Sequence, residues 1–354
     1  MKGLVLAGGK GSRLRPFTYT GPKQLVPIAN KPVLFYALDQ LVDAGITEIG
    51  VVVGDTASQI EEATGDGARF GARITYIHQP EPLGIAHGIL VARAFLADDP
   101  FVLILGDNFL REGIRLLVEQ FSLGVTNCQI LLQAVPRPEE LGVAVLQDGR
   151  VVRLVEKPRR WISNLAVIGI YFFDRHVHRA VRAIQPSPRG ELEITDTLQY
   201  LIDAGYHVGH IQLEGCWIDT GRVGDILAAN RAVLEVAEAR IDGHVDAQSE
   251  LQGIVIVEAG AEVRASTIEG PAIIGSGTLV ERAYIGPFTS IDHDCLLRDS
   301  QIAGSVVLDN TSIDRVPQRI EGSLIGRRVK LEGLSRPPKA YRLVLGDFSE
   351  AGLP

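Results

Sequence analysis

The chain has 354 residues, which exceeds the usual size of one domain, so its length predicts two domains. A hydrophobic share of 46% beside a charged share of 22% is typical of a globular protein and excludes a disordered chain. The formal net charge of −8 argues against a general nucleic-acid-binding role, which needs a cationic surface.

Residues 1–235 alternate between strand-like and helix-like segments, which predicts an α/β domain with a Rossmann-like, mixed and mostly parallel sheet. We assign residues 1–240 to this domain. Helices on both faces would cover the sheet, and ligands would bind beyond the carboxyl ends of its strands. The predicted strands are Gly3–Ala7, Glu48–Val53, Arg73–His78, Phe101–Leu105, Cys128–Ala134, Val143–Leu146 and Ala166–Phe173. The predicted helices are Val33–Asp43, Ala57–Thr64, Ala86–Phe95, Leu116–Phe121, Arg175–Ala183, Glu193–Asp203 and Val223–Ala239.

Residues 241–354 form the second predicted domain, because a repeat of 17 residues begins at Leu251. Fixed-period aliphatic residues with small turn residues between them predict a β-solenoid whose coils have three flat faces. About four coils fit into 251–320, and the segment 327–354 would cap or dock against the stack. The spacing resembles a short left-handed parallel β-helix of the hexapeptide type. The positions in step are Val257, Ile274, Ile291 and Leu308; Val263, Val280 and Leu297; and Leu251, Ile268, Ile285 and Ile302.

The loop after the first strand is rich in glycine and in cations, which favours phosphate binding. Gly8, Gly9 and Gly11 allow backbone N–H groups to approach a polyanion closely. Arg13 offers a planar fork of donors for phosphate oxygens. The loop has neither the Walker A spacing nor the dinucleotide fingerprint, whose third glycine position holds a leucine here.

Two aspartates follow apolar segments that are distant in sequence. Asp107 comes directly after the predicted strand Phe101–Leu105, and Asp219 lies in a Trp-Ile-Asp-Thr-Gly turn. Mg²⁺ prefers a few carboxylates together with phosphate oxygens and water. The pair therefore fits a magnesium site.

Segment 4–32, with Leu-Ala-Gly-Gly-Lys-Gly-Ser-Arg-Leu-Arg-Pro and Pro-Lys-Gln-Leu-Val-Pro-Ile-Ala-Asn-Lys-Pro, resembles the signature of sugar-1-phosphate nucleotidylyltransferases. Its details look most like glucose-1-phosphate thymidylyltransferases of the long bacterial type, and the resemblance continues to about residue 230. It implies the nucleotide-diphospho-sugar transferase fold. It also implies transfer of dTMP from dTTP to glucose 1-phosphate, which gives dTDP-glucose and pyrophosphate with Mg²⁺ as cofactor. Asp107 and Asp219 then correspond to the magnesium aspartates.

The resemblance also assigns the two halves of a substrate cleft. The residues expected to act in catalysis are Arg13, Lys23, Asp107 and Lys157. The nucleotide side would be formed by Leu6, Gly8, Gly9, Gly11, Ser12, Arg13, Gln24, Gln79, Pro82 and Gly84, with the glutamine amides matched to the base edge. The sugar-phosphate side would be formed by Asn108, Gly142, Glu156, Lys157, Val167 and Arg189. Thr195 and Asp196 would cap or stabilise the following helix.

Two further readings stay open. A uridylyltransferase or a promiscuous enzyme would use UTP, since the 5-methyl group that separates dTTP from dUTP offers only about 1–3 kcal/mol. A bifunctional enzyme would transfer acyl groups on its β-helix, with His293, the one histidine inside the clear repeats, as base. A silent scaffold subunit is disfavoured because Asp107, Asp219 and Arg13 are all present.

The remaining expectations concern location and partners. No apolar run approaches the roughly 20 residues of a membrane span, and the chain starts directly with strand-like residues rather than a signal peptide. Cys128, Cys216 and Cys295 form neither a zinc pattern nor a disulfide framework. We therefore expect a cytoplasmic protein that binds dTTP and glucose 1-phosphate, with no nucleic-acid or membrane partner. We also expect it to form a homo-oligomer through the β-helix.

Overall fold

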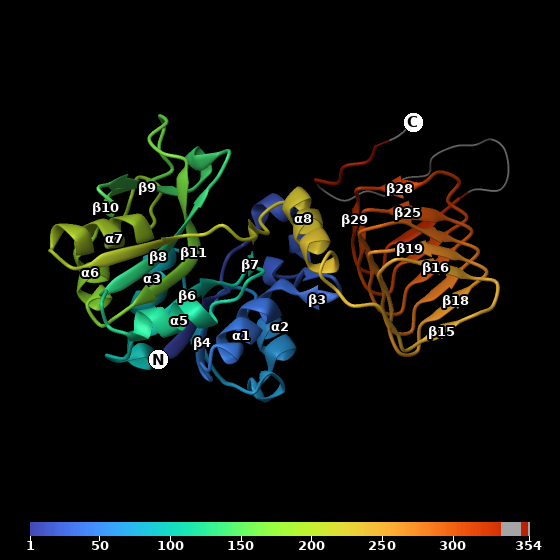
Figure 1. The fold of residues 1–354 in the computed structure, drawn as a ribbon, viewed down its shortest axis with the longest axis horizontal. Coiled ribbons are helices and arrows are strands. Elements are labelled where there is room, and N and C mark those ends of the chain that lie inside the picture. Colours follow the sequence, from blue (N-terminus) through green and yellow to red (C-terminus); the bar gives the residue numbers. More distant parts are fainter. Residues whose placement is uncertain (334–347, 353–354) are drawn as a thin grey trace. The chain divides into compact units, whose positions relative to one another are not determined.

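The computed structural model describes residues 1–333 and 348–352. It divides into two compact units, one made of Met1–Lys10 and Leu34–Asp219, the other of Gly11–Val33 and Thr220 onward (Figure 1). This division differs from the boundary predicted at residue 240. The loop segment 11–33 and the helix that begins at Val223 contact the coils of the second unit, which sequence periodicity alone does not reveal.

The centre of the first unit is a parallel sheet in the order β6-β1-β4-β5. Strands β1, β4 and β6 are mostly aliphatic and buried, as is usual for parallel strands covered on both faces. The edge strand β5 contains polar, exposed residues as well. Leu6 lies opposite both Val52 and Leu105, so the carboxyl ends of three strands meet at one edge. That edge carries the glycine loop and the residues that follow each strand. The strands are β1 (Lys2–Leu6), β4 (Glu48–Val53), β5 (Arg73–His78) and β6 (Phe101–Leu105).

The other half of this sheet is mostly antiparallel. The long strand β11 (Leu165–Phe173) runs antiparallel to β6 and to its other neighbours. Strands β10 and β12 and the two-stranded ribbon β7–β13 were not predicted, because their sequences mix polar with apolar residues. Besides β11, the bounds of the strands outside the parallel part are β7 (Asn108–Leu110), β8 (Cys128–Ala134), β9 (Gly142–Gln147), β10 (Arg150–Glu156), β12 (Val208–Gln212) and β13 (Trp217–Asp219).

The helices of the first unit agree with the predicted ones to within a few residues, with one break. The predicted helix Ala86–Phe95 is two helices that meet at Ala92. Phe101 and Phe173 are fully buried with ring centroids 5.6 Å apart, in the core that α6 and α7 cover (Figure 1). The helices are α1 (Val33–Asp43), α2 (Ala57–Thr64), α3 (Ile85–Val91), α4 (Arg93–Leu96), α5 (Arg115–Ser122), α6 (Val177–Ala183) and α7 (Ile194–Asp203).

The second unit contains a parallel β-helix with three ladders of short strands. Its inward aliphatic residues, such as Val280 and Leu297, are fully buried, which is the main stabilising term of such a stack. The ladders are β14 (Arg240–Ile241), β17 (Val255–Val257), β20 (Ala272–Ile274), β23 (Thr289–Ile291), β26 (Val306–Val307) and β29 (Leu324–Ile325); β15 (His244–Val245), β18 (Glu262–Arg264), β21 (Leu279–Glu281), β24 (Leu296–Arg298), β27 (Ser312–Asp314) and β30 (Lys330–Glu332); and β16 (Glu250–Gln252), β19 (Thr267–Glu269), β22 (Tyr284–Ile285), β25 (Gln301–Ala303) and β28 (Ile320–Glu321).

The stack is longer than the four coils predicted, and one register differs. It begins at Arg240 and its last described strand ends at Glu332. The prediction that Leu308 is in step with Ile291 is wrong, because Ile291 pairs with Val307. The turn between β25 and β26 is one residue shorter than the corresponding turn before it. Val307 and Leu308 are both apolar and buried, so the pattern alone did not reveal the shift.

Helix α8 (Val223–Leu234) and the hairpin of β2 (Pro27–Ile28) and β3 (Lys31–Pro32) also belong to the second unit. The fully buried Asn230 joins them to the coils. Its Oδ1 accepts hydrogen bonds from the Ala29 N–H at 2.8 Å and the Ser290 hydroxyl at 2.6 Å. Its Nδ2 donates to the Phe288 carbonyl at 3.0 Å. The helix ends at Leu234, before the predicted Ala239, because the first coil starts at Arg240.

Two other expectations concern the thiols and the tail. Cys128, Cys216 and Cys295 are thiols outside any disulfide, with Cys128 and Cys295 buried and Cys216 half-buried. The expected capping segment 327–354 lies largely outside the described residues, including Arg336, Pro337 and Pro338. In the described ranges, every helix is too short or too polar to cross a membrane.

Candidate active site

The predicted site residues occur in both compact units. Gly11, Ser12, Arg13, Lys23 and Gln24 belong to the second unit. The first unit holds Leu6, Gly8, Gly9, Gln79, Pro82, Gly84, Asp107, Asn108, Gly142, Glu156, Lys157, Val167, Arg189 and Asp219.

Gly8 and Gln79 are adjacent at the carboxyl edge of the parallel sheet. A Cβ atom on Gly8 would lie 3.4 Å from Gln79 Oε1 and equally close to the Gly54 backbone, so the Gln79 amide packs against this glycine. The Gln79 amide is held in place from the other side. Its Nε2 lies 3.2 Å from the Gly84 carbonyl and 2.9 Å from His87 Nδ1. The oriented amide therefore faces the glycine loop.

The loop around Gly84 is locked to the loop that carries Arg189. Gly84 has φ = +99°, and a Cβ there would lie only 2.6 Å from the Leu192 carbonyl oxygen. The Leu192 N–H donates to the Leu83 carbonyl at 2.7 Å, and the Ala86 N–H donates to the Leu192 carbonyl at 3.3 Å. The predicted nucleotide and sugar-phosphate segments are thus in backbone contact.

The antiparallel ribbon β7–β13 brings the two predicted metal ligands into the same region. In its register Asp219 lies opposite Asn108, the residue directly after Asp107. Asp107 and Asn108 are buried, with 6% and 4% of their surfaces exposed. Asn108 donates through Nδ2 to Asp107 Oδ1 at 3.3 Å and accepts from Trp217 Nε1 at 2.7 Å. The ribbon therefore places Asp219 opposite the residue that follows Asp107, although the two aspartates are distant in sequence.

Glu156 and Gly142 form a wall on the antiparallel side of the sheet. They are directly opposite each other in the β9–β10 hairpin. Glu156 Oε2 accepts a hydrogen bond from the Thr195 hydroxyl at 3.3 Å. Thr195 does not cap the helix, since Glu193 holds the N-cap position and Thr195 lies inside α7 and contacts Glu156. Asp196 lies in the first turn of α7, where a carboxylate stabilises a helix. Burial and the neighbouring Glu193 raise the pKa of Glu156, although Lys157 and Arg189 oppose the shift.

Arg189 is held by three carboxylates. Its guanidinium lies 2.9 Å from Glu193, 3.1 Å from Glu191 and 3.5 Å from Glu156. Glu193 also accepts a hydrogen bond from the Ser187 hydroxyl at 2.6 Å. Sequence reasoning assigned Arg189 to the sugar phosphate but missed Glu193, which orients it. The Glu-x-Glu spacing just after the arginine is the sequence signal that could have predicted this group of carboxylates around Arg189, which we call the arginine cage. A phosphate that binds Arg189 would replace one or more of these carboxylates as partners of the guanidinium group.

In the second unit, the glycine-rich segment turns at Gly11 in a left-handed conformation with φ = +60°. A Cβ at this position would lie 2.8 Å from Thr18 and 3.0 Å from Lys23 Cβ. The Thr18 hydroxyl donates to the Gly11 carbonyl at 2.8 Å. Gly11 therefore brings Lys23 close to the loop that carries Arg13, as a shared phosphate contact would require.

Gln24 is almost completely buried, with 1% of its surface exposed. In the part of the chain that the structure describes, its Oε1 has no hydrogen-bond partner. Leaving a buried acceptor unsatisfied costs about 1–3 kcal/mol, so such a group calls for a donor from outside the protein. An N–H group on a base edge is a donor of this kind.

Arg13 and Arg15 line a cavity of about 930 Å³ within the second unit, together with coil residues 322–327. The Arg15 guanidinium stacks over the Tyr19 ring at 5.0 Å and the Phe348 ring at 5.8 Å. The loop that carries Arg13 is therefore close to the β-helix.

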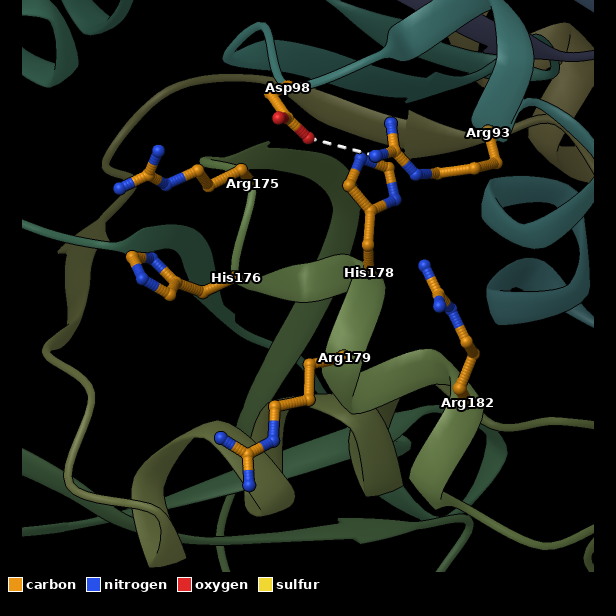
Figure 2. A pocket seen from close by; sticks show the side chains of 7 residues that line it. All are labelled: Arg93, Asp98, Arg175, His176, His178, Arg179 and Arg182. Atoms are coloured by element: carbon orange, nitrogen blue, oxygen red, sulfur yellow. Dashed lines mark hydrogen bonds and ion pairs between the residues drawn. The ribbon is translucent and has the colours of Figure 1, made fainter.

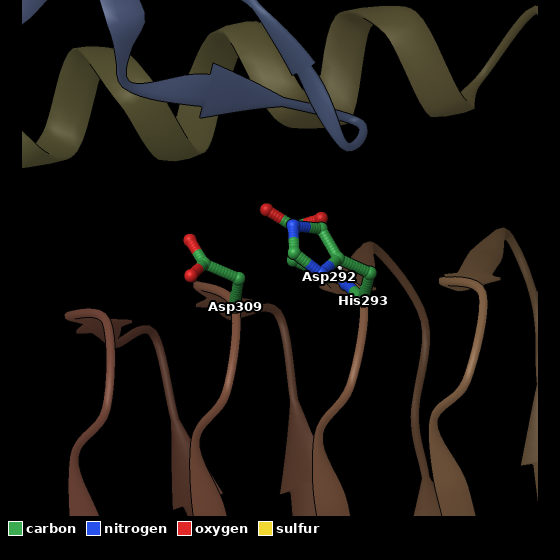
Figure 3. A group of neighbouring side chains, drawn as sticks. All are labelled: Asp292, His293 and Asp309. Carbon is green, nitrogen blue, oxygen red and sulfur yellow. Dashed lines mark hydrogen bonds between the residues drawn. The ribbon is translucent and has the colours of Figure 1, made fainter.

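Asp292, His293 and Asp309 form a cluster at neighbouring turns of the β-helix, on the side of α8 (Figure 3). Their possible ligand atoms lie within 4.8 Å of one another. Arg327 already pairs with Asp309 at 2.7 Å, and His293 pairs with Asp294 at 3.0 Å. The hydrogen bond to Asp294 raises the pKa of His293. These internal partners satisfy the cluster, and we assign no ion to it.

The first unit thus combines a mixed sheet, glycine residues at the carboxyl edge of its parallel strands, and Asp219 opposite Asn108, the residue that follows Asp107. The family model described as nucleotidyl transferase matches residues 2–236. Glucose-1-phosphate thymidylyltransferases of Streptomyces griseus and Streptomyces antibioticus are 52% and 53% identical to the chain, with 99% of each chain covered. A solved structure described as a glucose-1-phosphate thymidylyltransferase of Bacillus anthracis has a TM-score of 0.63 and 35% identity, and covers 68% of this chain and 98% of its own.

The chain therefore belongs to the nucleotidyl transferase family, and it is an enzyme of that class. The match to the two Streptomyces relatives extends through the β-helix, so the whole two-unit chain has counterparts in them.

Proposed function

We propose that this protein transfers dTMP from dTTP to glucose 1-phosphate, giving dTDP-glucose and pyrophosphate. An oxygen of the sugar phosphate attacks the α-phosphorus, and the bond from that phosphorus to the bridging oxygen of pyrophosphate breaks. The nucleophile is already an anion, so no base is required. The protein has to align two polyanions and neutralise their charge.

The observation that carries the proposal is the β7–β13 register, in which Asp219 lies beside the Asp107-Asn108 pair. The residues fit Mg²⁺, because a small number of carboxylate oxygens leaves room for phosphate oxygens and water. Asp107 and Asp219 would hold the ion. When bound, it would supply positive charge beside the α-phosphate.

The nucleotide side would use the glycine loop and the two glutamines. Backbone N–H groups at Gly8, Gly9, Gly11 and Ser12, with Arg13 and Lys23, would hold the triphosphate. Gln79, oriented by Gly84 and His87, would bind the base edge from the first unit. The unsatisfied Gln24 Oε1 would accept a hydrogen bond from an N–H group of the base. Leu6 and Pro82 would contact the base or ribose.

The sugar-phosphate side would use the hairpin wall and the arginine cage. Glu156 as a carboxylate would accept hydrogen bonds from sugar hydroxyls, with Gly142, Asn108 and Val167 as neighbours. Lys157 and Arg189 would contact the phosphate. Since Arg189 is linked to the nucleotide loop through Leu192, filling one half would help to order the other.

The test is pyrophosphate release with Mg²⁺, glucose 1-phosphate and each of dTTP, UTP, CTP, GTP and ATP. We expect dTTP to give the highest kcat/KM, and Asp107→Asn to lower kcat by at least about 10³-fold, which corresponds to ~4 kcal/mol. Asp148→Asn is the matched control, because Asp148 is exposed in a turn with φ = +49°, which asparagine tolerates.

Equal turnover with UTP would mean that the glutamines read only the edge that both bases share. Full activity of Asp107→Asn would overturn the metal assignment. No turnover with any nucleotide would overturn the proposed substrates.

The β-helix remains our predicted oligomerisation platform, and light scattering of the intact chain would test it. A monomer at micromolar concentration would contradict this prediction. Incubation with acetyl-CoA and amino sugars tests the acyltransferase alternative, for which His293 is the candidate base.

A further inference from the structure

A basic pocket lies at the edge of the first unit's sheet where β6 begins (Figure 2). Its volume is about 330 Å³, and its walls come from α4, the turn before β6, the turn before α6, and α6 itself. Gly106 and Asp107 follow the other end of β6. The pocket is therefore separate from the candidate metal site. The charged side chains that define it are Arg93, Asp98, Arg175, Arg179 and Arg182.

The charge of this pocket is not balanced by the protein. Arg93 pairs with Asp98 at 2.8 Å. In residues 1–333 and 348–352, no acidic side chain forms an ion pair with Arg175, Arg179 or Arg182. All three are exposed at the surface. Three uncompensated guanidinium groups around one concavity attract an anion, and a guanidinium binds phosphate oxygens through two parallel hydrogen bonds.

A buried histidine provides a second, independent observation. His178 has only 4% of its surface exposed, and its ring stacks on Phe101 with centroids 6.3 Å apart. Its Nε2 has no hydrogen-bond partner in the described part of the chain. Figure 2 shows the His178 ring directed toward the Arg93–Asp98 pair. A buried nitrogen without a partner is costly, and a ligand in the pocket would satisfy it.

The protonation state of this histidine favours a phosphate over a carboxylate. Burial, followed by the charge of Arg93, lowers the pKa of His178, and a hydrogen bond with the Ala97 backbone opposes the shift. The neutral ring can accept a hydrogen bond from a P–OH group. A monohydrogen phosphate brings that donor together with the anionic oxygens that the arginines bind, whereas an ionised carboxylate has no O–H group.

We propose that this pocket binds a small phosphate-bearing anion, held by Arg175, Arg179 and Arg182 around His178. Its volume is near the lower end of the roughly 300–1,000 Å³ that ligand pockets occupy. A compact anion such as phosphate, pyrophosphate or a sugar monophosphate therefore suits it better than a nucleotide sugar. The site does not depend on the proposed transfer reaction.

The experiment is isothermal titration of the full-length protein with sodium pyrophosphate, at constant ionic strength and with EDTA present. Separate titrations use inorganic phosphate and glucose 1-phosphate. We expect a saturable component that weakens at least tenfold in Arg175→Gln/Arg182→Gln. The same component should persist in Arg13→Gln, in which the proposed triphosphate site is altered. Arg153→Gln is the matched control, because Arg153 is also exposed and has no ion pair in the described chain.

A second variant, His178→Gln, tests the buried nitrogen, and circular dichroism verifies its fold. The double arginine variant keeps the test decisive if His178→Gln does not fold. Equal binding by the wild type and Arg175→Gln/Arg182→Gln would overturn the site, because the anion would then bind elsewhere. Binding of heparin without saturable binding of any small phosphate would also overturn it, since the surface would then be a site for acidic polymers.

Discussion

At the scale of single residues, Glu156 combines a proposed sugar-binding role with a stability cost. Its carboxylate is about one-fifth exposed and lies close to Glu193. Burial and this like charge raise its pKa in the folded chain above its ordinary value. The folded state therefore binds the proton more tightly than the unfolded state does. Ionisation of Glu156 lowers stability as pH rises from the unfolded to the folded pKa, and the loss persists at higher pH.

We expect Glu156→Gln to raise the melting temperature at pH 7.5 and to have less effect below pH 4, where the wild-type carboxyl is protonated. The same change should raise KM for glucose 1-phosphate about 10-fold or more, because a charged acceptor is lost. Thermal melts across pH and initial rates measure the two effects. Glu139→Gln, at an exposed glutamate, is the control. Lower stability of Glu156→Gln at neutral pH would contradict the pKa argument.

A substitution at Gln24 should affect substrate binding without lowering the stability of the fold. Since its buried Oε1 has no partner in the described chain, the similarly shaped and apolar Gln24→Met should unfold no more easily than the wild type. We expect KM for dTTP to rise about 10-fold, which corresponds to ~1.4 kcal/mol, while KM for glucose 1-phosphate changes little. Denaturant unfolding and substrate titrations give the comparison. A large loss of stability would show that the amide has a structural role instead.

At the scale of elements, the contact between the loops at Gly84 and Leu192 joins the two substrate sides. Gly84→Ala would combine an unfavourable positive φ with a contact of 2.6 Å to a backbone carbonyl. Gly149→Ala is the matched control, because Gly149 has φ = +72° but no atom within 4 Å of the added methyl group. We expect the control to cost about 1–2 kcal/mol.

Gly84→Ala should cost more than this control, and the displaced loops should raise KM for both substrates. Urea unfolding and steady-state kinetics test this prediction. A change in KM for dTTP alone would mean that the two loops move independently.

The β-helix shows how far an element can be read from a repeat. Its inward aliphatic residues recur with a period set by the coil, so the stack itself was predictable. The first two strands of the stack, β14 and β15, were not predicted, because an end coil covers little core and their residues are mostly exposed. The shortened turn before β26 was also hidden by the adjacent apolar pair Val307 and Leu308. The left-handed sense of the coils stays a prediction.

At the scale of the whole molecule, Asn230 gives the β-helix unit a role in holding the segment that we propose binds the nucleotide. It joins α8 and the coil that contains strand β23 to the β2–β3 hairpin, which comes shortly after Lys23 and Gln24. We expect Asn230→Ala to destabilise this unit by about 3 kcal/mol. The Ala29 N–H, the Ser290 hydroxyl and the Phe288 carbonyl would lose the hydrogen bonds that they form with Asn230.

Hydrogen exchange should then increase at the Ala29 amide and in the β2–β3 hairpin, while α7 is unaffected. KM for dTTP should rise. Asn164→Ala, at an exposed asparagine, is the control for the same substitution. Unchanged exchange in the hairpin would show that the coils do not support it.

The sequence alone determined the α/β class, most strand and helix positions, the repeat, and the candidate residues near glycine and aspartate motifs. These depend on local patterns, namely alternating strands and helices, a fixed period and turn chemistry. Tertiary structure decided which distant residues meet. The Asp219 register, the three carboxylates around Arg189, the unsatisfied His178 nitrogen and the linkage through Asn230 all depend on contacts between segments far apart in the chain. Such contacts are set by packing and strand pairing, which leave no periodic trace in one sequence.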